Sequence, residues 1–140
     1  MAKDKPTIHD ESEIEVPAEI LEVGFDFPRD IDKIHALELP VEEIPVEELE
    51  WHLDLPFFWQ PDEPFSLKPR DVLENPGVYK YSMGRIMSVD TSYPIDVMFW
   101  KGRWVILDGL HRFCQHFINK DVTVAVRKVP VESKELIMPD

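Results

Sequence analysis

The stretch PIDVMFWKGRWVILDGLHRFCQHFINKDVTVAVRKVP, residues 94–130, decides the fold of this chain. It begins with two apolar runs rich in β-branched and aromatic residues, 95–100 and 103–107, which are separated only by Lys101-Gly102. Because a two-residue turn that ends in glycine is typical of a tight β-hairpin, we predict two antiparallel strands here.

A helix and a further strand are predicted to follow the hairpin. From Leu110 the apolar side chains recur at i, i+3, i+4, i+7 and i+8, which indicates an amphipathic helix of about ten residues. Residues 122–129 then alternate and predict a closing strand. The valines expected on one face of this strand are Val122, Val124 and Val126. The step Asp108-Gly109 leads directly from the hairpin into the helix.

The start of that helix is the strongest candidate for a functional site. The first N–H groups of a helix have no partner within the helix, and the helix dipole favours negative charge there. We therefore predict that the backbone amides of Gly109, Leu110 and His111 bind a phosphate group, with Arg112 as a charged clamp. Gly109 would let the anion approach the backbone closely, since it has no Cβ atom.

Asp108 and His111 each allow a structural and a chemical interpretation. Asp108 is a good residue to cap the helix, and it is also a candidate metal ligand or acid–base group facing a bound phosphate. The two roles compete, because a carboxylate that caps the helix occupies amides that the phosphate needs. His111 would bind or protonate a phosphoryl oxygen, or would form a solvated pair with Arg112 on the polar flank of the helix.

The order of these features resembles the ParB/sulfiredoxin-like superfamily. The likeness covers residues 94–129, with Pro-Ile-Asp-Val, the hairpin, the Asp-Gly-Leu-His-Arg turn, the amphipathic helix and the last strand. The turn is most similar to the Asp-Gly-x-His-Arg form of free-serine kinases and of DGQHR proteins related to DndB. The resemblance implies a small α+β domain with a mixed sheet, which binds the phosphates of ATP or ADP at the helix start. On this hypothesis the chain is a phosphotransferase or nucleotide hydrolase, in which Asp108 holds Mg²⁺ or acts on the proton.

Departures from the family pattern limit the activities that the resemblance implies. Sulfiredoxins carry their nucleophilic cysteine directly before His-Arg, where this chain has Leu110, so we expect no reductase activity on sulfinic acids. Cys114 lies one turn further along the apolar face, which is typical of a core thiol. We also expect the DNA-binding helical region of ParB proteins to be missing, since the sequence ends soon after the last strand.

Four further residues are candidates for the same site or a second one. Arg85 and Asp90 precede the hairpin, at a place where the superfamily has a helix that contributes phosphate contacts. His52 and Asp54 stand two apart, so they would face the same side of an extended segment as a metal-ligand pair or an acid–base dyad. A helix there would turn them about 200° apart and remove that site.

The rest of the chain is predicted to complete a single domain over residues 18–140. Residues 1–17 are polar and without periodicity, and they predict a disordered or loosely docked acidic arm. The other expected elements are a short edge strand within 37–46, an extended loop with aromatic anchors over 56–69, and helices at 69–73 and 81–89.

Composition restricts the partners of this domain. With 28 acidic against 15 basic residues, the formal charge of −13 argues against binding of duplex DNA and against a nuclease, our third hypothesis. The single cysteine excludes an internal disulfide, and no apolar run reaches the roughly 18 residues of a membrane span, so we expect a cytoplasmic protein. The alternative to a nucleotide-binding enzyme is a non-catalytic module that binds a protein partner through its acidic N-terminal half and the cluster Phe57-Phe58-Trp59.

Overall fold

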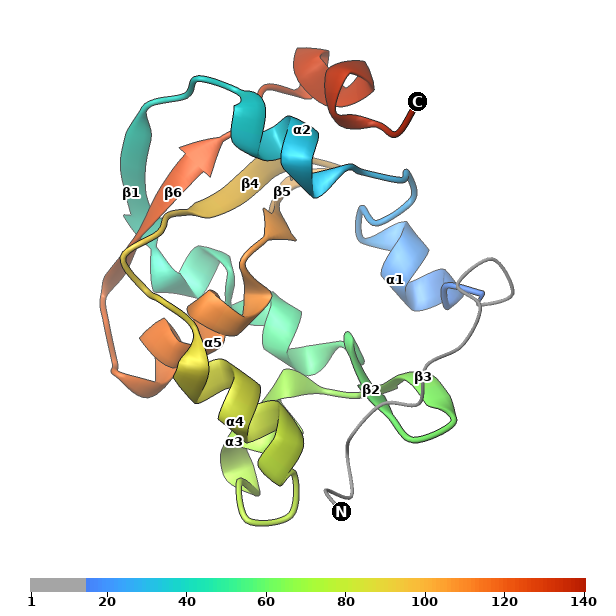
Figure 1. Ribbon diagram of the computed structural model, residues 1–140, viewed down its shortest axis with the longest axis vertical. Coiled ribbons are helices and arrows are strands. Elements are labelled where there is room, and N and C mark those ends of the chain that lie inside the picture. Colours follow the sequence, from blue (N-terminus) through green and yellow to red (C-terminus); the bar gives the residue numbers. More distant parts are fainter. Residues whose placement is uncertain (1–14) are drawn as a thin grey trace.

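A four-stranded mixed sheet with the strand order β1-β6-β4-β5 forms the centre of the structure. The computed structural model describes residues 15–140, and β6 (Thr123–Lys128) lies between β1 (Val41–Pro45) and β4 (Ile95–Trp100) (Figure 1). β4 runs parallel to β6, whereas β1 with β6 and β4 with β5 (Arg103–Asp108) pair antiparallel. The α+β class predicted from the sequence is confirmed.

The β4–β5 hairpin forms as predicted, around a two-residue turn. Lys101 and Gly102 both take the left-handed conformation, with φ of 53° and 84°, which suits a tight hairpin of this length. The first four residues of β4 are buried, so this strand is covered on both faces. Burial on both faces explains why its sequence is a nearly continuous apolar run.

A bulge interrupts the register at the open end of the hairpin. As far as the pair Val97–Ile106, the strands keep the register that the turn sets. Between Asp96 and Val97 the register shifts, so that Asp96 pairs with Asp108. The bulge thus places two carboxylates opposite each other, beside the turn that the sequence singled out.

The chain passes from β5 directly into α5 (Leu110–Ile118), as predicted. Gly109 joins the two elements with φ of 111°, in the region where a side chain is strained. Cys114 is fully buried on α5, which confirms it as a core thiol, and burial raises the pKa of that thiol to about 12. The next strand begins at Thr123, so Val122 lies just before it and is 82% exposed, whereas Val124 and Val126 are buried; the predicted start of the strand at residue 122 is one residue early.

Short helices complete the chain on either side of the sheet. They are α1 (Ala18–Glu22), α2 (Ile31–Ala36), α3 (Pro69–Glu74), α4 (Lys80–Ser88) and the 3₁₀ helices Val46–Glu48, Glu50–Asp54 and Val131–Ile137. α3 and α4 confirm the helices predicted at 69–73 and 81–89, and β1 confirms the predicted edge strand. Within residues 15–140 no helix has the length and apolar character needed to cross a membrane.

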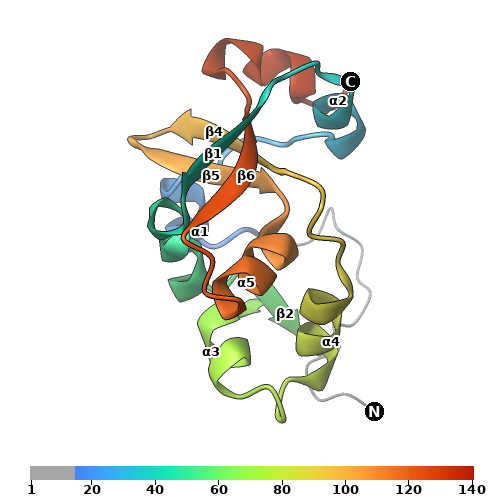
Figure 2. The same cartoon turned by 90° about the vertical axis from the view of Figure 1, so that its left-hand side faces the viewer.

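The two faces of the sheet pack against different helices. Because side chains alternate across a strand, Val97 belongs to one core cluster and Met98 to the other. The Val97 cluster includes residues of α3, α4 and α5, which lie together below the sheet (Figures 1 and 2). The Met98 cluster includes Ile34 of α2 and Ile137 of the C-terminal 3₁₀ helix, above the sheet in the same views.

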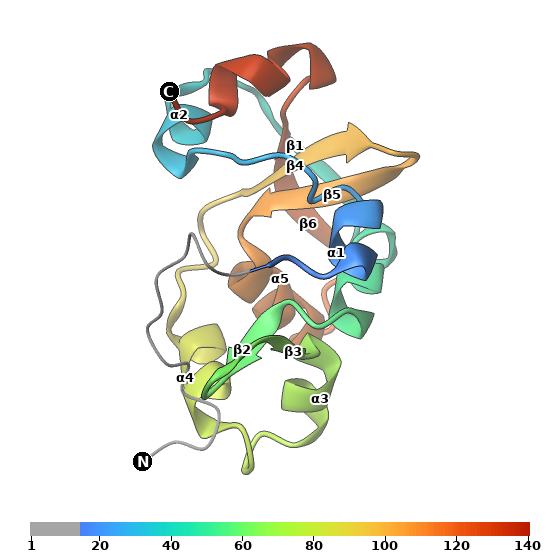
Figure 3. The ribbon, with the colours of Figure 1, turned by 90° about the vertical axis from the view of Figure 1, so that its right-hand side faces the viewer.

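The segment predicted as an extended loop over 56–69 is instead a second, two-stranded hairpin. β2 (Phe58–Gln60) pairs with β3 (Glu63–Leu67), and this hairpin lies on the same side of the molecule as α1 (Figures 1 and 3). The prolines of this segment are tolerated because both strands of a two-stranded sheet are edge strands. Asp62, with a positive φ of 59°, lies in the turn, and Phe65, with φ of 51°, lies in β3 where the register of the hairpin is irregular. The acidic arm predicted at 1–17 falls outside the described residues except for its last three.

Candidate functional site

A pocket of about 800 Å³ opens beside the corner where β5 meets α5. Its polar side holds the turn 108–112 together with Arg29 and Arg85, which come from segments far apart in the sequence. Its apolar side is formed around α1 and the β2–β3 hairpin, by Ile20, Leu21, Phe25, Phe57 and Phe65. The pocket therefore presents cationic and aromatic surface to one ligand.

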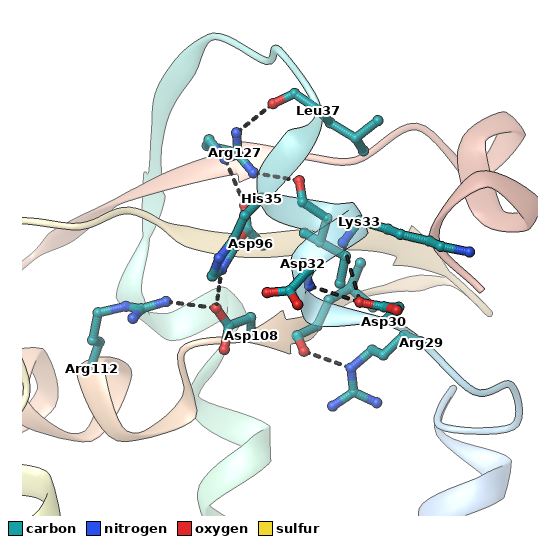
Figure 4. Close-up of polar contacts among 12 residues, drawn as sticks. Arg29, Asp30, Asp32, Lys33, His35, Leu37, Asp96, Asp108, Arg112 and Arg127 are labelled. Carbon is teal, nitrogen blue, oxygen red and sulfur yellow. Dashed lines mark hydrogen bonds and ion pairs between the residues drawn. The ribbon is translucent and has the colours of Figure 1, made fainter. Parts of the chain in front are cut away.

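The first turn of α5 is open to an acceptor. Gly109 occupies the N-cap position and no side chain caps the helix, so the first amide N–H groups have no partner within it. Asp108 does not cap the helix, so it does not compete with a phosphate for these amides. Its Oδ2 atom lies 2.8 Å from His35 Nε2 and accepts a hydrogen bond from Arg112 Nη2 at 3.2 Å (Figure 4).

Arg112 is only partly used by the fold. Its side chain is 18% exposed and forms one hydrogen bond, to Asp108, while its Nε atom is buried and has no partner among the described residues. A Cβ atom on Gly109 would lie 2.9 Å from Arg112 Nη2, so in this structure the glycine makes room for the guanidinium. A ligand that reached this corner could therefore gain hydrogen bonds from Arg112 that the protein leaves unmade.

Arg29 is a second cation at the pocket, and sequence reasoning missed it. Its Nε atom donates to the carbonyl of Leu107 at 2.6 Å, at the exposed edge of β5, and its guanidinium lies over the ring of Phe25. Burial lowers the pKa of Arg29, and the charge of Asp108 opposes that shift, so the group stays a cation. No local pattern marks this residue, because its place depends on how the α1–α2 segment packs against β5.

Of the two candidates that precede the hairpin, one lines the pocket. Arg85 lies on α4, lines the pocket and is exposed. Its guanidinium forms no hydrogen bond or ion pair with the described residues. Asp90 does not line the pocket; its carboxylate accepts hydrogen bonds from the N–H and the hydroxyl of Ser92, at 2.9 and 2.6 Å. These bonds lower the pKa of Asp90 and give it a local role in the turn before β4.

His111 lines the pocket as a neutral ring. It stacks on Phe58 with ring centroids 4.9 Å apart and planes inclined by 14°. Burial, followed by the positive charges of Arg85 and Arg112, lowers the pKa of His111 to about 4. At neutral pH the imidazole can donate or accept a hydrogen bond, but it carries no proton to give as an acid.

His52 and Asp54 do not form the predicted pair. Their segment is a 3₁₀ helix and not the extended strand on which that prediction depended. His52 is buried: its Nδ1 atom lies 2.8 Å from the carbonyl of Leu49, and its Nε2 atom accepts the N–H of Ile106 at 3.0 Å. Burial lowers the pKa of His52 to about 3. Asp54 points outward and pairs with Arg70 at 2.6 Å.

A second group of polar residues adjoins the corner, and it joins Asp108 to His35 and Asp96, which sequence reasoning missed. His35 of α2, Asp96 of β4 and Asp108 of β5 offer one ligand atom each, all within 4.8 Å of one another (Figure 4). Arg127 donates from Nε to Asp96 Oδ1 at 2.7 Å and from its other two nitrogens to backbone carbonyls. We call His35, Asp96 and Asp108 the carboxylate–histidine cluster.

The surroundings shift the pKa values of the two carboxylates of this cluster in opposite directions. Burial raises the pKa of Asp96, although Arg127 opposes that shift. Burial would also raise the pKa of Asp108, but the hydrogen bond from His35 and the charge of Arg112 outweigh it and leave the pKa below its ordinary value. Asp108, whose pKa is lowered, faces both the pocket and the cluster.

No protein-family model matches this chain, and no curated protein or solved structure shows significant similarity to it. The likeness to the ParB/sulfiredoxin-like superfamily therefore stays a prediction that rests on the residues of the turn and its flanking elements. The α+β architecture and the geometry of the pocket stand independently of that likeness.

Proposed function

We propose that this protein binds the phosphate groups of a nucleotide, ATP or ADP, at the β5–α5 corner. One observation carries the proposal: an uncapped helix start and three arginines from three separate segments converge on a single pocket. In a chain of net charge −13, such a concentration of cations is a local exception. Phosphate oxygens are the acceptors that helix amides and guanidinium groups bind together.

Each part of the pocket has a role in this proposal. The amides of Leu110 and His111 bind the phosphate nearest the helix, and Arg112 turns toward it as a clamp. Arg29 and Arg85 bind the outer phosphates. The aromatic wall around Phe25, Phe57 and Phe65 stacks on the base or the ribose of the nucleotide.

The reaction class that fits this arrangement is phosphoryl transfer or nucleotide hydrolysis. Such chemistry depends mainly on positioning and on stabilisation of developing negative charge, which arginines and helix amides supply. The ionised Asp108 would hold a divalent cation such as Mg²⁺ or accept a proton, and the neutral His111 would hydrogen-bond a phosphoryl oxygen. The cytoplasmic location expected from the sequence belongs to this proposal.

Calorimetric titration with ADP, ATP and CTP, each with and without Mg²⁺, tests the proposal. Arg85→Gln should weaken nucleotide binding about tenfold, because a hydrogen bond to a charged group is worth roughly 1.5–3 kcal/mol. Arg103→Gln is the matched control: it removes an equally exposed arginine that lies over Trp51 and does not line the pocket. No heat change at millimolar nucleotide, or equal loss in both variants, would overturn the proposal.

The hypothesis of a protein-binding module has less support from the geometry. Phe58 is buried beneath His111, and Phe57 lines the pocket and packs edge-on against Phe25, so two members of the aromatic cluster are used by the core and the pocket wall. A pull-down that compares Trp59→Ala with Arg112→Gln separates the two functions, because only a protein partner would depend on the tryptophan. The acidity of the chain continues to argue against duplex DNA as a partner.

A further inference from the structure

We infer that the carboxylate–histidine cluster is a binding site for a divalent transition metal, of the Zn²⁺ or Mn²⁺ class, which fills when Arg112 leaves Asp108. The site lies outside the nucleotide pocket, on the opposite side of Asp108. Its metal-binding property stands on its own residues, and only its coupling to the nucleotide rests on the proposed function.

The burial of Asp96 is the first observation that points to a ligand. The side chain of Asp96 is only 3% exposed, and Arg127 takes up its Oδ1 atom. Its Oδ2 atom has no hydrogen-bond donor among the described residues and lies 3.8 Å from His35 Nε2. The carboxylate is therefore almost wholly buried, and its second oxygen meets only the imidazole nitrogen, on the side of the second pocket.

The β-bulge is the second observation, because it builds the pair of carboxylates. With the register that the turn sets, Asp96 would stand opposite Leu107 and away from Asp108. The register shift puts Asp96 opposite Asp108, and the cluster is completed by His35 from α2. Bulges are concentrated next to functional sites, where they redirect a side chain.

The surroundings of the cluster give a metal ion access and room for water ligands. A second pocket, of about 580 Å³, is lined by His35, Asp96, Arg112 and Arg127 together with Tyr93 and Pro94. The side chain of His35 is 54% exposed at this opening. Three protein ligands with open coordination positions are the arrangement of catalytic metal sites, whereas structural sites are closed.

The donor set selects the kind of metal. Mg²⁺ prefers oxygen ligands and keeps its waters, whereas an imidazole nitrogen beside two carboxylates suits first-row transition metals. His35 Nε2 must be unprotonated to bind a metal, so the hydrogen bond that it now forms with Asp108 is exchanged for a bond to the ion.

Arg112 controls whether Asp108 is available. Arg112 donates a hydrogen bond to the same Oδ2 atom of Asp108 that faces His35. This bond, of 3.2 Å, is the one that Arg112 forms, and its Nε atom is unpaired among the described residues. Arg127, by contrast, forms three hydrogen bonds and stays with Asp96. When Arg112 turns to a phosphate in the first pocket, Asp108 loses its counter-charge. A divalent cation then supplies the positive charge that Asp108 has lost, so metal and nucleotide should bind cooperatively.

Titration with Mn²⁺, followed by the electron paramagnetic resonance signal of the free ion at neutral pH, tests this inference. The wild-type chain should bind Mn²⁺ with nitrogen coupling in the pulsed spectrum, and Arg112→Gln should bind it several-fold more tightly. His35→Ala should weaken binding at least about tenfold. His116→Ala is the matched control, because His116 is also paired with an aspartate, Asp121 at 2.7 Å, but lies outside the cluster.

Two outcomes would overturn the inference. One is that neither the wild-type chain nor Arg112→Gln binds Mn²⁺ or Zn²⁺; the other is that His35→Ala binds them as well as His116→Ala does. A titration with ADP in the presence of EDTA separates this result from the proposed function. If the protein binds ADP but no metal, the nucleotide proposal stands and the metal site is ruled out. If it binds the metal but no ADP, the metal site stands and the nucleotide proposal is ruled out.

Discussion

His52 and Arg112 both line the pocket, but the structure uses their nitrogen atoms in opposite ways. Both ring nitrogens of His52 are engaged, one with the carbonyl of Leu49 and one with the N–H of Ile106. Arg112 forms a single hydrogen bond, to Asp108, and leaves its Nε atom buried and unpaired among the described residues. Native proteins match nearly all of their buried polar groups. His52 therefore completes the fold, whereas Arg112 has hydrogen-bonding capacity that the fold does not use.

The largest expected effect is on stability, at the residue that is fully matched. His52→Leu leaves the buried N–H of Ile106 without a partner and removes the side-chain hydrogen bond to the carbonyl of Leu49, so it should lower the free energy of unfolding by about 3 kcal/mol. Urea denaturation measures this change. His35 is exposed, so His35→Ala should change the free energy of unfolding by less than about 0.5 kcal/mol. Equal free energies of unfolding for the wild type and His52→Leu would mean that the hydrogen bonds of the His52 ring do not stabilise the fold.

The next effect is on binding, at the residue that is incompletely matched. Arg112→Gln should cost about 2 kcal/mol of nucleotide affinity, or roughly 30-fold, since a charge-assisted contact to phosphate is lost. Its effect on stability should be small, because the fold uses only one bond of this side chain. Arg70→Gln is the control, because Arg70 is matched by Asp54 and Glu50 away from the pocket. Equal loss of nucleotide affinity in both variants would contradict the comparison.

Gly109 offers a smaller test of the same corner. Gly109→Ala places a side chain at φ of 111° and within 2.9 Å of Arg112 Nη2, so it should lower the free energy of unfolding by about 1.5 kcal/mol and weaken nucleotide binding. Gly84→Ala is the matched control, because a Cβ atom there meets nothing within 4 Å and the site is inside α4. That change should stabilise the protein by up to about 1 kcal/mol. Thermal and urea unfolding, with ADP titration, distinguish the two.

Local sequence signals predicted the hairpin, α5 and the Asp108-Gly109 corner, because each depends on residues within one or two turns of each other. The carboxylate–histidine cluster could not be predicted in this way. A hairpin counted from Lys101-Gly102 pairs Asp96 with Leu107, and only the bulge brings Asp96 to Asp108. Propensity does not show where a bulge will form.

Long-range packing explains the other differences. His35 and Arg29 reach the site because the α1–α2 segment lies along β5, a contact between parts of the chain that are far apart in sequence. His52 was placed on an extended segment because Trp51-His52-Leu53 alternates, yet the chain forms a 3₁₀ helix there and buries the ring against β5. For Arg29 and His35 no local pattern marks the residue, and for His52 tertiary contacts overrode the local pattern.

The smallest effect concerns the charge of His111, which decides what a phosphate meets at the helix start. Burial, followed by Arg85 and Arg112, lowers the pKa of His111 to about 4, whereas an unfolded histidine has a pKa of about 6.5. Between these values the unfolded chain binds a proton that the native protein does not. The stability due to His111 is therefore complete above about pH 6.5 and is lost as the pH falls toward about 4. Relative to His111→Gln, the wild-type protein should lose about 1 kcal/mol of unfolding free energy between neutral pH and about pH 5.5, measured by urea denaturation. A constant difference across this range would mean that the native ring is already charged, and the corner would then meet a phosphate with an imidazolium as well as its arginines.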